Sequence, residues 1–259
     1  MEMKGKNVLV TGAGSGLGKA CALLLAAEGA NLALLGRTPK ELEETASAAN
    51  ALGGSAMTLV ADIADEGAMQ SAFKQIEKRF GNLDGVFANA GINGTWAPID
   101  DLTYEEWNET VRINLGGTFL TLHLSVPLMK RNGGSIVITS SINGTRTFTN
   151  GGASAYSTTK AGQLALGQMA ALELARYRIR VNVICPGAIE SEIGDNTNRR
   201  NVRRASVRAT FPDGRVPLTK GEPGAAGDVA RLVRFLLSDD AGHISGTPIW
   251  IDGAQSLLI

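Results

Sequence analysis

Short apolar runs alternate with longer helical patterns along the whole chain, and this alternation restricts the fold more than any other feature. The first two runs, 8–11 and 32–35, are each followed by a helical pattern, beginning near Gly16 and near Pro39. Further runs occur at 57–61, 83–88, 135–139, 180–184 and 248–251. Strands that are apolar throughout are typical of parallel sheets covered by helices on both faces. The sequence therefore predicts an α/β fold with seven parallel strands.

Composition and charge restrict the organisation and the partners. The 259 residues show no break in composition, which favours a single domain over 1–259. Because 25 basic side chains balance 25 acidic ones, the charge argues against a nucleic-acid or membrane-surface binder. The longest apolar run, 20–27, is too short to span a bilayer, and the N-terminus has no apolar signal core. Two distant cysteines, Cys21 and Cys185, exclude a disulfide framework or a metal cluster, and we expect a cytoplasmic protein.

One irregular segment, at about 192–224, interrupts the alternation. Before Glu222 it contains seven basic residues against three acids, Glu192, Asp195 and Asp213; the basic residues are Arg199, Arg200, Arg203, Arg204, Arg208, Arg215 and Lys220. The segment is predicted to be a lid over the substrate. Its arginines could meet an anionic substrate or carrier, pair with acids of a neighbouring subunit, or remain solvated.

The first strand leads into a glycine-rich turn. Thr11 is followed by Gly12, Ser15, Gly16, Leu17 and Gly18, with the spacing GxxxGxG. Glycines permit a tight turn between strand and helix and let a pyrophosphate approach the helix N-terminus. Such a run could also be a tight turn without a ligand.

The end of the second strand indicates which cofactor is bound. NAD-binding folds usually place an acid there for the ribose 2′-hydroxyl, whereas this chain has Arg37 and Thr38. A guanidinium would hold a 2′-phosphate, which favours NADP(H) and leaves NAD(H) possible, although Arg37 could equally be solvated. Asp62 and Ile63 follow the third strand, and the acid is either a helix cap or a partner of the adenine amine.

Two further patterns concern a proton donor and helix starts. Tyr156 and Lys160 stand four residues apart at the start of a long helical pattern, after a strand that ends near Ser141. A nearby ammonium favours the phenolate and lowers the tyrosine pKa, although most such pairs are surface pairs. Capping boxes are predicted at Thr38 with Glu41 and at Thr103 with Glu106.

Together these residues resemble the short-chain dehydrogenase/reductase family over nearly the whole chain, and the chain is similar to its 3-oxoacyl-ACP reductases. The resemblance rests on TGxxxGxG from Thr11, Asp62-Ile63, Asn89-Ala90-Gly91, Asn114, Ser141, Tyr156-xxx-Lys160 and Pro186-Gly187-x-Ile189-x-Ser191. It implies a Rossmann-type doubly wound sheet in three layers, NAD(P)-dependent interconversion of alcohols and ketones, and a homotetramer.

The resemblance also implies residue roles. Tyr156 would be the general acid or base, Lys160 would lower its pKa and bind the nicotinamide ribose, and Ser141 would bind the substrate oxygen. Asn114 would hold a water that relays protons toward Lys160. The remaining motif residues would contact the cofactor: Asn89, Ala90 and Gly91 would lie beside it, and Pro186 and Gly187 would also bind it. The Ile189 backbone and the Ser191 hydroxyl would fix the nicotinamide carboxamide.

The chain departs from the family pattern in three places. Ser191 replaces a more common threonine and keeps the hydroxyl, and Ala254 stands where the family often has a second glycine. The loop between Ser141 and Tyr156 is about two residues longer than usual, so Arg146, Thr147 and Phe148 are candidate pocket residues.

Three functions remain open on the sequence alone. The first is NADP(H)-linked interconversion of a 3-oxoacyl-type or similar small ketone and a secondary alcohol. The second is NAD-dependent oxidation of a sugar or secondary alcohol. The third is a regulator that binds the cofactor without catalysis, because one fold can carry unrelated functions.

Overall fold

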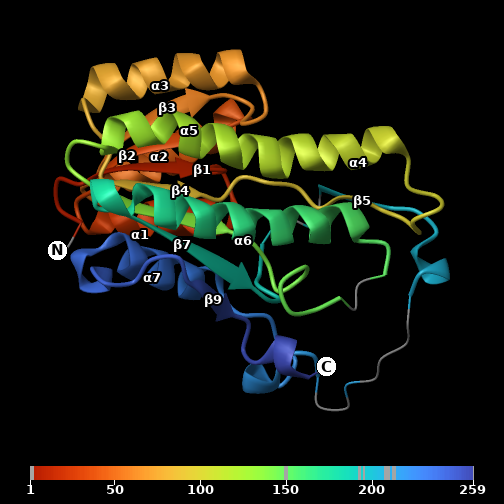
Figure 1. Cartoon of the computed structure of the whole chain (residues 1–259). Helices are drawn as coiled ribbons and strands as arrows, with labels where there is room; N and C mark the ends of the chain where they lie inside the picture. The colour runs from red at the N-terminus through yellow and green to blue at the C-terminus, as the bar shows by residue number, and fades with distance from the viewer. Residues whose placement is uncertain are drawn as a thin grey trace.

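The computed structural model describes residues 3–148, 151–191, 194, 196–206, 211 and 214–258. Its central sheet has seven parallel strands in the order β3-β2-β1-β4-β6-β7-β9 (Figure 1). These strands are β1 (Asn7–Thr11), β2 (Asn31–Gly36), β3 (Ser55–Val60), β4 (Gly85–Ala88), β6 (Gly134–Thr139), β7 (Ile179–Pro186) and β9 (Pro248–Ile251). The predicted sheet is confirmed. Because β1 pairs with both β2 and β4, the order reverses at β1, where ligands bind in such sheets.

Helices cover both faces of the sheet and complete the three layers. They are α1 (Gly16–Ala27), α2 (Pro39–Ala51), α3 (Glu66–Phe80), α4 (Tyr104–Val111), α5 (Gly117–Met129), α6 (Ser154–Leu174) and α7 (Ala226–Leu237). Buried side chains of α1, α2 and α7 form one core, and those of α3, α5 and α6 form the other. A π-helical turn, Arg112–Gly116, joins α4 to α5 (Figure 1).

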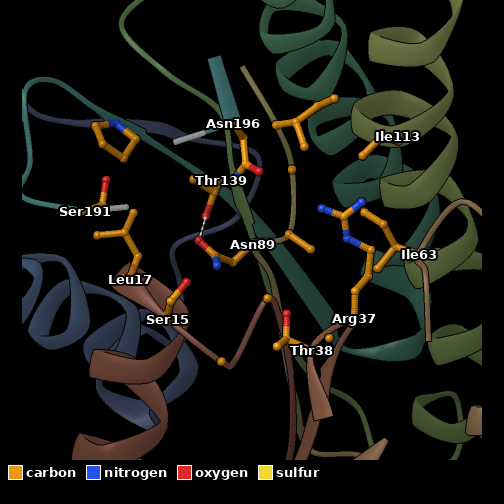
Figure 2. Close-up of a pocket in the computed structure, with 18 of the residues that line it drawn as sticks. Ser15, Leu17, Arg37, Thr38, Ile63, Asn89, Ile113, Thr139, Ser191 and Asn196 are labelled. Atoms are coloured by element: carbon orange, nitrogen blue, oxygen red, sulfur yellow. Dashed lines mark hydrogen bonds between the residues drawn. The ribbon is translucent and has the colours of Figure 1, made fainter. Parts of the chain in front are cut away.

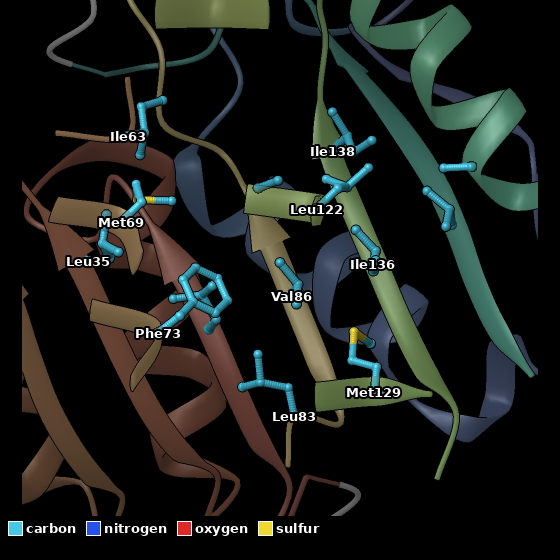
Figure 3. Close-up of a cluster of buried hydrophobic side chains, with 14 of the residues drawn as sticks. Leu35, Ile63, Met69, Phe73, Leu83, Val86, Leu122, Met129, Ile136 and Ile138 are labelled. Carbon is cyan, nitrogen blue, oxygen red and sulfur yellow. The ribbon is translucent and has the colours of Figure 1, made fainter. Parts of the chain in front are cut away.

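Successive strand residues point to opposite cores. In β6, Ile136 and Ile138 pack with Met69 and Phe73 of α3 in one core, whereas Val137 belongs to the other (Figure 3). All these side chains are at most 5% exposed. The apolar runs of the sequence are continuous because each strand supplies apolar side chains to both cores.

Some boundaries and one helix start differ from the sequence-based expectation. Strand β4 begins two residues later than predicted, and β7 extends to Pro186. The capping box at Thr103 is confirmed, since Glu106 N donates to Thr103 Oγ1 and Thr103 N donates to Glu106 Oε2. The prediction of a capping box at Thr38 is wrong: Thr38 makes no side-chain cap hydrogen bond, and the Glu41 side chain, which would have to reach back to Thr38 N, lies against Gly14.

Two short strands lie outside the central sheet. β5 (Gly94–Trp96) and β8 (Thr197–Arg199) form a parallel pair with the register Gly94 to Thr197 and Trp96 to Arg199. The sequence did not predict this pair, because three-residue strands carry no recognisable apolar run. It joins part of the predicted lid segment to the chain that follows β4.

Replacing Thr103 by Ala should lower the free energy of unfolding by about 1 kcal/mol, because the Glu106 N–H loses its acceptor. The same change at Thr38 should cost a few tenths of a kcal/mol at most. Chemical denaturation without ligand measures both. Equal losses of unfolding free energy in the two variants would contradict the finding that Thr103, and not Thr38, forms a capping box.

Candidate active site

A cavity of about 440 Å³ opens at the carboxyl ends of β1, β2, β4 and β6. Most predicted site residues line it: Gly12, Ser15, Gly16, Leu17, Arg37, Thr38, Asp62, Ile63, Asn89, Ala90, Gly91, Ser141, Tyr156, Lys160, Pro186, Gly187, Ile189 and Ser191. Figure 2 shows Ser15, Leu17 and Ser191 on one side and Arg37, Thr38 and Ile63 on the other. Gly18 and Asn114 lie behind the wall and do not line the cavity.

The glycine-rich turn requires glycine at two of its positions, Gly12 and Gly18. Gly12 has φ +66°, in the left-handed region, and a Cβ on Gly18 would lie 2.1 Å from the Gly12 carbonyl oxygen. Ser15, the N-cap of α1, makes no side-chain cap hydrogen bond, so it leaves the first N–H groups of the helix uncovered. A glycine-rich turn beside open helix N–H groups fits the pyrophosphate of a dinucleotide.

Thr11 connects this turn to the strand beside it. Its hydroxyl accepts hydrogen bonds from Asn89 N (2.9 Å) and Ala90 N (3.0 Å), and its carbonyl accepts one from Asn89 Nδ2 (3.2 Å). Asn89 Oδ1 accepts from the Thr139 hydroxyl at 3.2 Å (Figure 2). These contacts join the ends of β1, β4 and β6, which fixes the floor of the cavity.

Tyr156 and Lys160 project from the first turns of α6 and are both buried. Lys160 Nζ lies 5.4 Å from the centre of the Tyr156 ring and donates to the Thr139 carbonyl at 3.0 Å. Burial lowers the pKa of Lys160 to about 8. Burial also raises the pKa of Tyr156, although a hydrogen bond from Ser141 opposes this. The expected lowering of the tyrosine pKa by lysine is therefore not seen in the protein alone, because desolvation dominates.

Ser141 and Ser140 have different roles. The Ser141 hydroxyl lines the cavity, bonds to Tyr156 and accepts from Asn143 N at 3.1 Å. The Ser140 hydroxyl instead donates to the Lys160 carbonyl at 2.7 Å. Of these two serines, only Ser141 forms a hydrogen bond with the Tyr156 phenol, which supports Ser141 as the residue that would bind the substrate oxygen.

Asn114 lies in the π-helical turn and is fully buried. Its amide group donates to the Ile92 carbonyl (2.9 Å) and to Thr159 Oγ1 (3.0 Å), and Oδ1 accepts from Ile92 N (2.9 Å). A Cβ on Gly91 would lie 2.9 Å from Asn114 Oδ1 and 3.9 Å from Lys160 Nζ. Both amide hydrogens are used, so only Oδ1 can bind another donor, and the water relay stays a prediction.

The adenosine side of the cavity holds a residue that sequence reasoning missed. Arg37 is exposed and, among the described residues, forms no ion pair, whereas Glu41 lines the same cavity from the first turn of α2. A Cβ on Gly14 would lie 2.7 Å from Glu41 Oε2. The place of Glu41 soon after Arg37 in the sequence could have indicated this carboxylate. Its spacing from Thr38, however, is also that of a capping box. Asp62 lines the cavity and accepts from Ala64 N (2.9 Å) in the loop before α3. The helix cap of α3 is Asp65, which accepts from Ala68 N, so the interpretation of Asp62 as a helix cap is wrong.

The lid segment is attached to the site through β8. Asn196 lines the cavity, and the Trp96 ring of β5 lies 6.3 Å from the Tyr156 ring. Two arginines of the segment pair with acids of the same chain: Arg200 with Asp101 (3.3 Å) and Glu106 (2.6 Å), and Arg204 with Asp100 (2.8 Å). Hydrogen bonds from Arg200 help to lower the pKa of Glu106 to about 2. Pairing within the chain was not among the predicted roles of these arginines, and Glu192, Asp195, Arg208 and Asp213 lie outside the described residues.

The long loop after Ser141 does not line the cavity in its described part. The Arg146 guanidinium stacks on Trp250 of β9, with Cζ 3.5 Å from the ring centre, and Trp250 Nε1 donates to Thr145 Oγ1 at 3.2 Å. Thr147 is buried and Phe148 is 75% exposed. The prediction of Arg146, Thr147 and Phe148 as pocket residues is therefore wrong for this cavity, because the loop folds onto β9.

Neither a membrane span nor a metal cluster is found in the described part of the chain. None of its helices is long and apolar enough to cross a membrane. Within the described residues, no group of three or more His, Cys, Asp or Glu side chains is placed to hold a metal ion.

Comparison with known proteins assigns the chain to a family. The model described as "Enoyl-(Acyl carrier protein) reductase" matches residues 12–254. Levodione reductase from Leifsonia aquatica is 39% identical over 96% of this chain and 93% of that protein. The 3-oxoacyl-[acyl-carrier-protein] reductase FabG from Thermotoga maritima is 33% identical over 98% of both. The crystal structure of a 3-ketoacyl-ACP reductase from Sinorhizobium meliloti 1021 is 55% identical, covers 98% of this chain and 100% of that one, and has a TM-score of 0.95.

With the three-layer parallel sheet and these matches over nearly its full length, the chain belongs to the short-chain dehydrogenase/reductase family of NAD(P)-dependent oxidoreductases.

Proposed function

We propose that this chain interconverts a ketone, of the 3-oxoacyl type or a similar small carbonyl compound, and a secondary alcohol with NADP(H). The observation that carries the proposal is the buried arrangement of Tyr156 with Ser141 on one side and the Lys160 ammonium nearby. The names of the relatives, a levodione reductase and 3-oxoacyl-ACP reductases, support carbonyl reduction. We further propose that residues 1–259 act as one domain in the cytoplasm, with the segment at about 192–224 covering the substrate.

The proposed mechanism assigns a proton to Tyr156. Bound nicotinamide supplies or accepts the hydride. In reduction, the Tyr156 phenol donates its proton to the carbonyl oxygen, which Ser141 orients through a hydrogen bond. The phenolate that remains is stabilised by the Ser141 hydroxyl and the Lys160 ammonium, and in oxidation the same phenolate accepts the alcohol proton. Burial of these groups excludes water from the proton transfer.

The residues around the cavity fit each part of the cofactor. The proposal places the pyrophosphate at the turn of Gly12, Ser15, Gly16, Leu17 and Gly18, and the adenosine near Arg37, Thr38, Asp62 and Ile63. Asn89, Ala90 and Gly91 would lie beside the cofactor, and Lys160 would hold the nicotinamide ribose. The carboxamide would bind at Pro186, Gly187, Ile189 and Ser191. In this arrangement Asn114 would hold a water that relays protons toward Lys160.

Replacing Tyr156 by Phe should reduce kcat by about 10² to 10⁴, because the proton donor is lost. Cofactor affinity should stay within about twofold, since the ring that packs in the site is retained. Absorbance of the reduced nicotinamide over a panel of ketones and alcohols gives the rates, and Tyr104→Phe, at a side chain 74% exposed, is the control. Retained turnover would refute the assigned acid, and tight binding with no turnover by the wild type would favour a regulator.

Two opposite charges at the adenosine side determine the cofactor preference in this proposal. Arg37 would bind the 2′-phosphate of NADP(H), whereas the Glu41 carboxylate beside Gly14 would repel it. Glu41 could instead accept a hydrogen bond from a ribose hydroxyl, which favours the alternative of an NAD-dependent sugar or secondary-alcohol dehydrogenase.

Replacing Arg37 by Gln should weaken NADP⁺ binding by about tenfold or more, and Glu41→Gln should strengthen it severalfold. Both substitutions should change the affinity for NAD⁺ less, because NAD⁺ lacks the 2′-phosphate. Titration calorimetry of the purified protein gives the dissociation constants, and Lys40→Gln, an exposed neighbouring cation, is the control. Wild-type NAD⁺ binding as tight as NADP⁺ binding would reject the NADP(H) assignment.

We propose a homotetramer as the assembly. Large apolar side chains of α5 and α6 are exposed, with Phe119 at 50%, Met169 at 55% and Leu172 at 75%. A groove lined by residues of the same two helices adjoins them. Such an apolar surface on two neighbouring helices is typical of a subunit interface.

Replacing Leu172 by Glu should shift the protein to a smaller assembly, because the carboxylate would be desolvated at the interface. Light scattering after size-exclusion chromatography measures the mass, and Leu52→Glu, at an exposed apolar residue after α2, is the control. A wild-type monomer would contradict the proposed assembly.

A further inference from the structure

Trp96 and Arg199 form a pair beside the proposed proton donor. They are register partners in the β5–β8 pair, so their side chains lie on the same face of this small sheet. The Arg199 guanidinium lies over the Trp96 ring, with Cζ 5.5 Å from its centre. The same ring is 6.3 Å from the ring of Tyr156. A cation and a flat aromatic surface are thus presented next to the phenol that would protonate the substrate.

The charge of Arg199 is not neutralised within the described chain. Arg200 bonds to Asp101 and Glu106, and Arg204 bonds to Asp100. For Arg199, by contrast, the described residues offer no carboxylate within 4.0 Å. Alternation along the strand explains this difference, because Arg199 shares the face of Trp96 and the next residue points away from it. Arg200 is then an anchor of β8, whereas Arg199 retains an uncompensated charge near Tyr156.

We propose that the substrate carries an anionic oxygen group, a carboxylate or a phosphate, which Arg199 binds while the carbonyl group lies at Tyr156. The inference rests on the proposed function, because it takes Tyr156 as the proton donor. A guanidinium is suited to such groups, since its N–H donors match two oxygens at once. The apolar body of the substrate would lie along the Trp96 indole. Binding would leave the Arg200 and Arg204 ion pairs intact, so that β8 stays in place.

The test compares ketones that differ only in this charge. The probes are 4-oxopentanoate, 5-oxohexanoate, 6-oxoheptanoate and 7-oxooctanoate, each with its methyl ester, and dihydroxyacetone phosphate with dihydroxyacetone. The wild type should show, for at least one pair, a KM about tenfold or more lower for the anion, as expected of one charge-assisted contact. A lowered KM for an oxo acid would identify a carboxylate as the bound group, and a lowered KM for dihydroxyacetone phosphate would identify a phosphate.

Variants then assign the preference to a residue. Arg199→Gln should raise the KM of the anion about tenfold to the level of its neutral partner and leave the KM of the neutral ketone within about twofold. Arg199→Lys should retain part of the preference, and raised salt should weaken it. The control is Arg203→Gln, an exposed arginine that forms no ion pair within the described part of the segment.

The outcomes separate this inference from the proposed function. The role of Arg199 would be overturned if each anion and its neutral partner had equal KM values, or if Arg199→Gln raised the KM of both equally. Turnover of the neutral ketones would still support the reductase in either case. The same loss in Arg203→Gln would also overturn it. If neither anions nor neutral ketones are turned over with either cofactor, the proposed function and this inference both fail.

Discussion

Burial of the central strands on both faces is the constraint from which the site follows. Each strand must supply apolar side chains to two cores, and such strands are joined by helical crossovers that keep them parallel. Parallel strands all end at one edge, which brings Thr11, Asn89, Thr139 and Pro186 together although 175 positions separate the first from the last. The polar chemistry is therefore confined to the one edge where the backbone leaves the cores.

The sheet and most of the site could be predicted from the sequence because their signals are local. Apolar runs identify the strands, and the glycines and the Tyr156-Lys160 spacing identify the turn and the helix that carry the chemistry. Features that depend on distant contacts were missed. The spacing of Thr38 and Glu41 is that of a capping box, yet only the position of Gly14 shows why Glu41 lies at the cavity. The fold of the 142–148 loop onto Trp250 likewise required the place of β9.

The zero net charge hides an uneven distribution. Acids at 100–106 compensate Arg200 and Arg204, which attaches β8 to α4 and to the chain just before it. Arg37 and Arg199 have no such partner in the described chain; Arg37 lies at the cavity, and Arg199 lies over the Trp96 ring that neighbours Tyr156. The pairing and the position of each arginine thus decide whether it can meet a ligand, and composition alone reveals neither.

The buried ammonium of Lys160 opposes the stability of the fold that holds it. Its pKa is about 8 in the folded protein against an ordinary value of 10.5. Since the unfolded chain binds the proton more strongly, this group makes the fold less stable at every pH below about 8, and the penalty disappears as pH rises toward 10.5. At neutral pH the penalty is on the order of 3 kcal/mol, a substantial part of the stability of a typical domain. The apolar cores on either side of the sheet must therefore supply stability beyond what folding alone requires, so that a charge can be kept out of water.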